Sequence, residues 1–190
     1  MAPAELLVVR HAQSTWNAER RWAGQLDPEL SAAGRTQAAA LATRLAAEET
    51  PFAAVACSDL RRARQTAAIL AMALRLPEPA SVPGLRERRA GRWEGLTSPE
   101  IEERFPGALE RWRRGEVVDQ PGGEPWGAFT IRVVAALAEL ARGNFPLPAV
   151  VVAHQGVLRA LEHHFGVAPR RAADLRGLLL DARLSRLAHW

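Results

Sequence analysis

The stretch Leu6-Leu7-Val8-Val9-Arg10-His11 decides how this chain folds. Four apolar residues without a break, followed at once by an Arg-His pair, are typical of a strand that is buried on both faces and ends at a polar edge of a sheet. The run Ala149-Val150-Val151-Val152-Ala153, followed by His154, repeats this pattern near the other end of the chain. A weaker third copy lies at Ala53-Ala54-Val55-Ala56-Cys57. The sequence therefore predicts a sheet with buried, parallel strands at its centre.

Segments with helical spacing separate these strands, so that strands and helices alternate along the chain. The helical segments are 31–48, 60–74, 126–141 and 156–165. Such alternation favours an α/β fold, a three-layer α/β/α sandwich with a mostly parallel central sheet. We expect a further strand over 81–85, and an antiparallel hairpin of 175–180 and 183–189 at the edge of the sheet.

The segment around residues 97–125 carries signals of its own. Thr97-Ser98-Pro99-Glu100 is typical of a helix start, with a capping hydroxyl, a proline in the first turn and a glutamate placed for a capping box. We expect this short helix to end near Phe105-Pro106-Gly107, and Pro121-Gly122-Gly123-Glu124-Pro125 to form a loop. The sequence therefore predicts one domain over residues 1–190, with a short lid-like segment around 97–125.

Composition excludes several function classes. Of the 190 residues, 48% are hydrophobic and 24% are charged, which is typical of a globular protein and not of a disordered or fibrous one. All 25 basic residues are arginines, and the absence of lysine excludes a Walker A loop and Schiff-base chemistry. The net charge of +4 is modest and the arginines are spread along the chain, so we expect no nucleic-acid partner.

Cys57 is the only cysteine, which excludes an intrachain disulfide and a multi-cysteine metal site and fits a reducing compartment. The apolar run at 6–9 is too short for a secretory signal, and no stretch reaches the roughly 18 apolar residues of a membrane span. We therefore expect a cytoplasmic protein without membrane contact. We also expect Cys57 to be a packing residue, because a cysteine phosphatase needs Cys-x5-Arg and the residue at that offset is Ala63.

The residues that follow the predicted strands carry the chemistry, because ligands of open α/β sheets bind beyond the carboxyl ends of the strands. Arg10 and His11 follow the first strand, Arg62 the second, Glu87 the third and His154 the fourth. Guanidinium groups bind phosphate oxygens in forked pairs, and a neutral imidazole nitrogen can attack phosphorus. A protonated carboxylic acid can supply the proton that an alkoxide needs, and a second, cationic histidine can stabilise the transferring phosphoryl group. This set suits a phosphomonoester and requires neither metal nor cofactor.

Four motifs, in order along residues 6–160, resemble those of the histidine phosphatases, the phosphoglycerate mutase-like superfamily. The motifs are Arg10-His11-Ala12-Gln13-Ser14, with Trp16-Asn17, Gly24-Gln25-x-Asp27 and Leu30-Ser31-x-x-Gly34 at matching spacing; Ser58-Asp59-Leu60-Arg61-Arg62-Ala63-Arg64-Gln65-Thr66-Ala67; Leu85-Arg86-Glu87 with Gly91-Arg92-Trp93-Glu94-Gly95-Leu96-Thr97; and Ala153-His154-Gln155-Gly156-Val157-Leu158-Arg159. A single Arg-His pair would be a weak signal, whereas four ordered motifs at this spacing are specific.

The resemblance implies a role for each matching residue. His11 would be the nucleophile that is phosphorylated in a covalent intermediate, and Glu87 would be the proton donor. Arg10, Arg62 and His154 would line the phosphate pocket.

Further positions are implied to bind the substrate. Asn17 falls where the family uses an amide to hold the phosphate, and Gly24 where the backbone approaches the substrate. Gln155 follows the second histidine and is expected to contact the substrate as well. The chain departs from the commoner family residues at Ala12, Gln13, Gln155 and Pro125, and these departures bear on substrate preference more than on phosphate chemistry.

Several residues have competing interpretations. Glu94 competes with Glu87 for the acid role, and the family spacing favours Glu87. Arg113 and Arg114 are either a solvated charged run or residues of a lid that reaches over the site. We expect structural or solvated roles for His163, His164 and His189, and positions near the rim of the site for Trp22, Trp93, Trp112 and Trp126.

We therefore expect a metal-independent phosphomonoester hydrolase that acts on a small phosphorylated metabolite through a phosphohistidine on His11. A cofactor-dependent phosphoglycerate mutase is the nearest alternative. The short distance of about thirty residues between Glu94 and the Gly122-Gly123 loop favours hydrolysis, because a mutase must shield its phosphohistidine. A non-catalytic module that binds phosphate or nucleic acid is the alternative from another class. The sequence leaves the alcohol part of the substrate and the oligomeric state open, a homodimer included.

Overall fold

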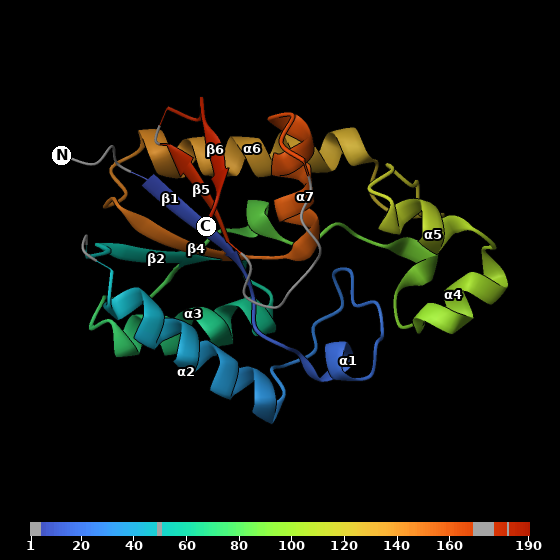
Figure 1. Ribbon diagram of the computed structural model, residues 1–190, viewed down its shortest axis with the longest axis horizontal. Helices are drawn as coiled ribbons and strands as arrows, with labels where there is room; N and C mark the ends of the chain where they lie inside the picture. Colours follow the sequence, from blue (N-terminus) through green and yellow to red (C-terminus); the bar gives the residue numbers. More distant parts are fainter. Residues whose placement is uncertain (1–4, 49–50, 169–176, 182) are drawn as a thin grey trace.

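The computed structural model describes residues 5–48, 51–168, 177–181 and 183–190. Within these residues, six strands form one sheet in the order β3-β2-β4-β1-β5-β6 (Figure 1). The strands are β1 (Glu5–Arg10), β2 (Ala54–Cys57), β3 (Ala80–Ser81), β4 (Ala149–Ala153), β5 (Gly177–Asp181) and β6 (Leu187–His189). None of the described helices is long and apolar enough to cross a membrane.

The central part of the sheet is parallel, as the buried apolar runs predict. β1 pairs in parallel with β4, β4 with β2, and β2 with β3. β5 pairs antiparallel with both β1 and β6, so the expected hairpin at the sheet edge is present. Residues 175 and 176 of its expected first strand lie outside the described residues. The prediction of a mostly parallel α/β sheet is confirmed.

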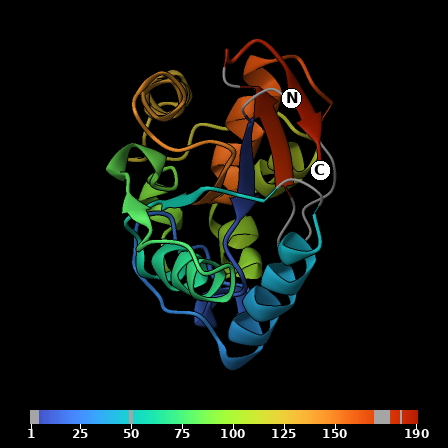
Figure 2. The same cartoon turned by 90° about the vertical axis from the view of Figure 1, so that its left-hand side faces the viewer.

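Helices cover both faces of the sheet and complete the three layers (Figures 1 and 2). Leu7 and Val9 of β1 point to one helix layer, and Leu6 and Val8 point to the other, because successive side chains of a strand alternate between its faces. One layer consists of α2 (Ala32–Ala46) and α3 (Arg61–Ala73), the other of α6 (Trp126–Arg142) and α7 (Gln155–His164).

The third predicted strand is shorter than expected. β3 ends at Ser81, and Pro83–Leu85 forms a 3-10 helix, η1, in place of the rest of the strand. Pro83 has no amide hydrogen to donate to a neighbouring strand and its φ is fixed, so it ends the strand and suits the first turn of a helix. The prediction of a strand through 85 is therefore wrong beyond Ser81.

Short elements gather beyond the carboxyl ends of the parallel strands (Figure 1). They are α1 (Thr15–Ala18), η2 (Gly91–Trp93), α4 (Ser98–Arg104) and α5 (Ala108–Arg113). Thr97 and Glu100 form the expected capping box of α4, whereas the sequence analysis did not anticipate α1 or α5. The last three of these elements contribute to a small apolar core separate from the sheet, which contains Trp93, Ile101, Leu109 and Val118.

Candidate active site

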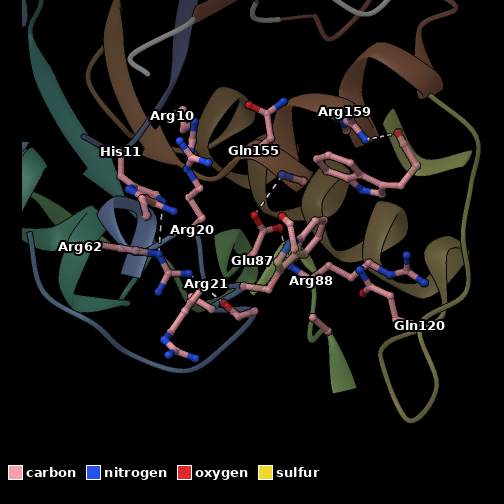
Figure 3. Close-up of a pocket in the computed structure, with 18 of the residues that line it drawn as sticks. Arg10, His11, Arg20, Arg21, Arg62, Glu87, Arg88, Gln120, Gln155 and Arg159 are labelled. Carbon is pink, nitrogen blue, oxygen red and sulfur yellow. Dashed lines mark hydrogen bonds between the residues drawn. The ribbon is translucent and has the colours of Figure 1, made fainter. Parts of the chain in front are cut away.

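A cavity of about 390 Å³ opens where the strand-end residues meet (Figure 3). The predicted site residues that line it are Arg10, His11, Asn17, Gly24, Arg62, Glu87 and Gln155. His154 does not line the cavity and is fully buried, with its ring centroid 5.1 Å from that of His11. The register of the sheet explains this pairing, because Arg10 lies opposite Ala153 and the next residue on each strand is a histidine.

The ring of His11 is held in one tautomer by two hydrogen bonds. Arg62 Nε–H, which can only donate, lies 3.2 Å from His11 Nε2, so Nε2 must be the unprotonated nitrogen. The proton therefore sits on Nδ1, which donates to the carbonyl oxygen of Ala12 at 2.6 Å. The backbone amide of His11 also donates to the carbonyl oxygen of Ala153 at 2.9 Å, which continues the β1–β4 ladder. These contacts leave Nε2 unprotonated, with its lone pair accepting the hydrogen bond from Arg62 in the free protein.

Burial lowers the pKa of the His11 ring well below its usual range, and the positive charges of Arg62 and Arg10 lower it further. Burial and the charges of Arg62, His11 and Arg10 likewise lower the pKa of His154. Both rings are therefore neutral at pH 7 in the free protein. A cationic His154, which the sequence analysis invoked, is disfavoured there until an anion is bound. Within the described residues neither ring nitrogen of His154 has a hydrogen-bond partner, and both nitrogens are buried behind the cavity lining.

Arg62 joins the nucleophile to the loop after α1. It lies in the first turn of α3, where it is 2% exposed, and its two terminal nitrogens donate to the carbonyl oxygens of Leu26 and Gly24, each at 2.8 Å. Burial lowers the pKa of Arg62 to about 10, so its guanidinium stays charged at neutral pH. Gly24 has a φ of +50°, and a Cβ there would collide with the Glu94 carboxylate. Only glycine suits this position.

The two candidate acids occupy different places. Glu87 lines the cavity, and its carboxylate accepts hydrogen bonds from the amides of Arg88 at 2.8 Å and Gly156 at 3.1 Å. Glu94 is not among the described residues that line the cavity, and its Oε1 accepts from the amides of Gln25 and Ala90. Geometry therefore favours Glu87 as the group that can reach a bound ester.

The two predicted substrate-binding amides, Asn17 and Gln155, both line the cavity. Asn17 accepts the amide hydrogen of Ser14 through Oδ1, which turns its NH₂ group away from that bond. Gln155 begins α7, and neither of its amide atoms has a partner within the described part of the chain. Both can donate to an anion.

The segment around 97–125 reaches the cavity through Ser98, Trp112 and Gln120. Arg113 and Arg114 are exposed and outside the cavity lining, and Arg114 pairs with Glu110 along one helix face. The solvated interpretation of these two arginines therefore agrees with the structure.

Three of the four tryptophans expected at the rim do line the cavity: Trp22, Trp112 and Trp126. Trp93 is instead fully buried in the small core, because η2 turns its side chain inward, so that expectation is wrong. Cys57 is buried in the main core, where burial raises the pKa of its thiol to about 12, in agreement with a packing role.

The sequence analysis missed four further arginines that line the cavity: Arg20, Arg21, Arg88 and Arg159. All four lie within the quoted motifs or between their residues, but periodicity could not show which way their side chains point. Arg21 donates to the carbonyl oxygen of Gly95, Arg88 to that of Val118, and Arg159 to that of Trp112. These three bind the loops of the cavity wall together.

No group of three or more His, Cys, Asp or Glu side chains suited to a metal occurs among the described residues. Metal independence stays a prediction for experiment.

Comparisons with known proteins agree on one family. The profile of the histidine phosphatase superfamily (branch 1) matches residues 6–189. A metal-independent phosphoserine phosphatase of Arabidopsis thaliana is 38% identical over 159 residues, which cover 83% of this chain and 66% of the plant protein. A glucosyl-3-phosphoglycerate phosphatase of Mycobacterium tuberculosis is 37% identical over 199 aligned positions, which cover 100% of this chain and 88% of that protein.

The solved structures give the same answer for the fold. The structure of a mycobacterial glucosyl-3-phosphoglycerate phosphatase in complex with VO₃ superposes with a TM-score of 0.84 at 32% identity, covering 98% of each chain. The α/β/α architecture and the strand-end cavity described above are therefore accompanied by sequence similarity along almost the whole chain. The chain belongs to branch 1 of the histidine phosphatase superfamily.

Proposed function

We propose that this chain hydrolyses small phosphate monoesters through a phosphohistidine on His11. The observation that carries the proposal is the unprotonated Nε2 of His11, held by Arg62 beside a cavity that also presents Arg10 and Glu87. A neutral imidazole with a fixed lone pair is a nucleophile, and the surrounding guanidiniums bind and orient the phosphate. The phosphomonoesterase class agrees with the family and with the names of the phosphatase relatives.

In the first step, His11 Nε2 attacks phosphorus and the bond to the ester oxygen breaks. Glu87, in its protonated form, gives its proton to the departing alkoxide, so the alcohol leaves neutral. Arg10 and Arg62 bind the phosphoryl oxygens, and the charge that develops on these oxygens is stabilised by their fixed positions. Asn17, Gln155 and the backbone at Gly24 complete the phosphate pocket, and His154 packs behind His11.

In the second step, water replaces His11 on phosphorus. The Glu87 carboxylate, now deprotonated, accepts a proton from the attacking water, the P–N bond breaks, and inorganic phosphate is released. His11 returns to its starting tautomer because its Nδ1–H remains bonded to the Ala12 carbonyl oxygen throughout.

We also propose that the chain works as one domain in which the segment around 97–125 forms a lid over the alcohol part of the substrate. Trp112 and Gln120 support this, because they reach the cavity from that segment while its arginines face solvent. A cytoplasmic location stays a prediction of the sequence, and the oligomeric state stays open.

The test is to trap the intermediate. Acid-labile, base-stable phosphate on His11 is expected after rapid quenching with p-nitrophenyl phosphate, together with steady release of inorganic phosphate in the presence of EDTA. Loss of activity in EDTA that a divalent ion restores would contradict the mechanism.

Two further assays separate the alternatives. Isomerisation of 3-phosphoglycerate with strict dependence on 2,3-bisphosphoglycerate would favour a mutase. DNA binding that weakens steeply with salt, without any turnover of ester, would favour a binding module.

A further inference from the structure

The cavity carries more positive charge than a phosphate group needs. Six arginines and, among the described lining residues, one carboxylate, Glu87, surround it. A phosphomonoester dianion next to Arg10 and Arg62 uses two of these positive charges. The charges of the other four arginines are either paired with groups of the protein or available to a substrate.

Three of the four are held by the protein itself. Arg21 pairs with Glu19 and Glu100, and Arg88 pairs with Asp119. Arg159 stacks on Trp112, with its guanidinium carbon 3.5 Å from the ring centroid. These side chains are parts of the cavity wall.

Arg20 differs from them. Its side chain is exposed at the cavity, and within the part of the chain that the structure describes it makes no hydrogen bond and no ion pair. Figure 3 shows it on the side of the cavity that holds Arg10 and Arg62. Asn17, in α1, also lines the cavity, and the backbone amide of Arg20 donates to its carbonyl oxygen at 3.1 Å. An unpaired positive charge therefore lies on the side of the cavity that holds Arg10 and Arg62, the predicted phosphate contacts.

We propose that Arg20 binds a carboxylate of the substrate and so selects phosphate esters of small hydroxy acids, an inference that rests on the proposed function. An unpaired guanidinium carries one positive charge and can donate two parallel N–H hydrogen bonds. A carboxylate carries one negative charge and can accept both bonds. Because Arg20 shares this side of the cavity with Arg10 and Arg62, the carboxylate would lie within a few bonds of the ester oxygen. Arg20 is thus a specificity residue, distinct from the groups that act on phosphorus.

The backbone at Arg20 provides a matched control. Arg20 has a φ of +58° and follows α1 in a Schellman turn, in which the amides of Arg20 and Arg21 donate to the carbonyl oxygens of Asn17 and Trp16. Arg75, at the end of α3, has a φ of +57° and the same pair of bonds, but it is not among the described residues of the cavity. The left-handed backbone is therefore not the sign of function. A change at Arg75 reproduces the change of charge and of backbone strain away from the site.

The experiment compares 3-phosphoglycerate with the glycerol phosphate of matching configuration, in which a hydroxymethyl group replaces the carboxylate. The wild type is expected to prefer 3-phosphoglycerate by at least about tenfold in kcat/KM, the effect of one charged hydrogen-bonded pair. Arg20→Gln and Arg20→Gly should each bring this ratio close to one, whereas Arg75→Gln and Arg75→Gly should keep it. Arg20→Gly also relieves the left-handed backbone, so loss of the ratio in that variant does not come from misfolding.

Three results would overturn the proposal. A wild type that hydrolyses both esters with equal kcat/KM, or an Arg20→Gln enzyme that keeps the preference, contradicts the role of Arg20 while leaving the proposed hydrolysis intact. An equal loss on both esters would assign Arg20 to the phosphate instead. Failure of the wild type to release phosphate from these esters and from p-nitrophenyl phosphate would remove the proposed function and this inference together.

Discussion

The floor and the mouth of the cavity are built on different principles. The floor, which we define as Arg10, His11, Arg62 and His154, stands on strand ends and on the first turn of a helix, and three of its members are at most 4% exposed. The mouth, which we define as Arg20, Trp22, Trp112 and Gln120, stands on turns and short helices beyond the sheet. The register of β1 against β4 fixes the floor, whereas bonds from arginines to loop carbonyls fix the mouth.

This difference assigns separate tasks to the two regions. The floor holds a neutral nucleophile among permanent positive charges, an arrangement that depends on burial and tolerates little change. The mouth is partly exposed and presents guanidinium, indole and amide groups to the rest of a substrate. We therefore expect substitutions in the floor to abolish turnover of every ester, and substitutions in the mouth to change preference among esters.

His11→Ala should have the largest effect. Removing the nucleophile is expected to lower kcat by at least about 10⁴-fold on any phosphate ester, because His154, the other imidazole of the floor, is buried and does not line the cavity. His164→Ala, which removes an exposed histidine at the end of α7, is the control and should stay within about twofold of the wild type. A His11→Ala enzyme of near-normal rate would contradict the division between floor and mouth, since the floor would then not hold the nucleophile.

The neighbouring residues Arg61 and Arg62 give a second contrast. Arg62→Gln should lower kcat/KM by about 10²–10³-fold and the free energy of unfolding by about 2 kcal/mol, because the carbonyl oxygens of Gly24 and Leu26 lose charged donors. Arg61 forms an exposed ion pair with Glu29, so Arg61→Gln should cost no more than about 0.5 kcal/mol. Urea denaturation and the same kinetic assay measure both. Equal effects of the two variants would mean that burial does not distinguish the floor.

The floor is also the part of the site that the sequence could predict. The apolar runs at 6–9 and 149–152 are enough to place Arg10, His11 and His154 at one edge of a parallel sheet, because strand ends follow from hydrophobic pattern alone. The hydrophobic pattern does not predict that β1 and β4 are neighbours or how their residues are paired. This pairing places His11 beside His154.

The mouth could not be predicted in the same way. Trp93 and Trp112 both lie in loop-rich sequence, yet one is in the small core and the other lines the cavity, and only the packing of η2 and α5 decides between them. No sequence pattern predicts that Arg20 lines the cavity, because an isolated arginine in a loop is most often a solvated surface residue. Pro83 did carry a signal, and giving it full weight would have ended β3 at the right place.

Glu87→Gln tests the boundary between the two regions, because Glu87 faces the departing alcohol. We expect a loss of about 10²–10³-fold with alkyl phosphates and less than about tenfold with p-nitrophenyl phosphate, whose leaving group hardly needs a proton. Glu94→Gln is the control, since its amide oxygen can still accept from Gln25 and Ala90. Equal losses on both esters in Glu87→Gln would indicate a structural role for Glu87.

The smallest expected effect is on stability against pH, and it concerns the floor alone. The pKa values of His11 and His154 are lowered by folding, so below about pH 6.5 the unfolded chain binds more protons than the folded one. The contribution of these two histidines to the free energy of unfolding should therefore be at its full value above pH 6.5. It should fall as the pH drops toward their folded pKa values, by up to about 1.4 kcal/mol per pH unit for each histidine.

His154→Gln separates this linkage from general acid unfolding. It removes one of the two titrating rings. The slope of the unfolding free energy against pH, between pH 6.5 and pH 5, should therefore decrease by up to about 1.4 kcal/mol per pH unit, which corresponds to one proton. Urea denaturation at several pH values measures this slope. The decrease should come without any change at the mouth, because His154 is fully buried behind His11. A variant with the wild-type slope would show that folding does not lower the pKa of His154. Burial next to Arg62 and Arg10 would then fail to disfavour the charged form of this ring, and the same explanation for a neutral His11 would lose its support.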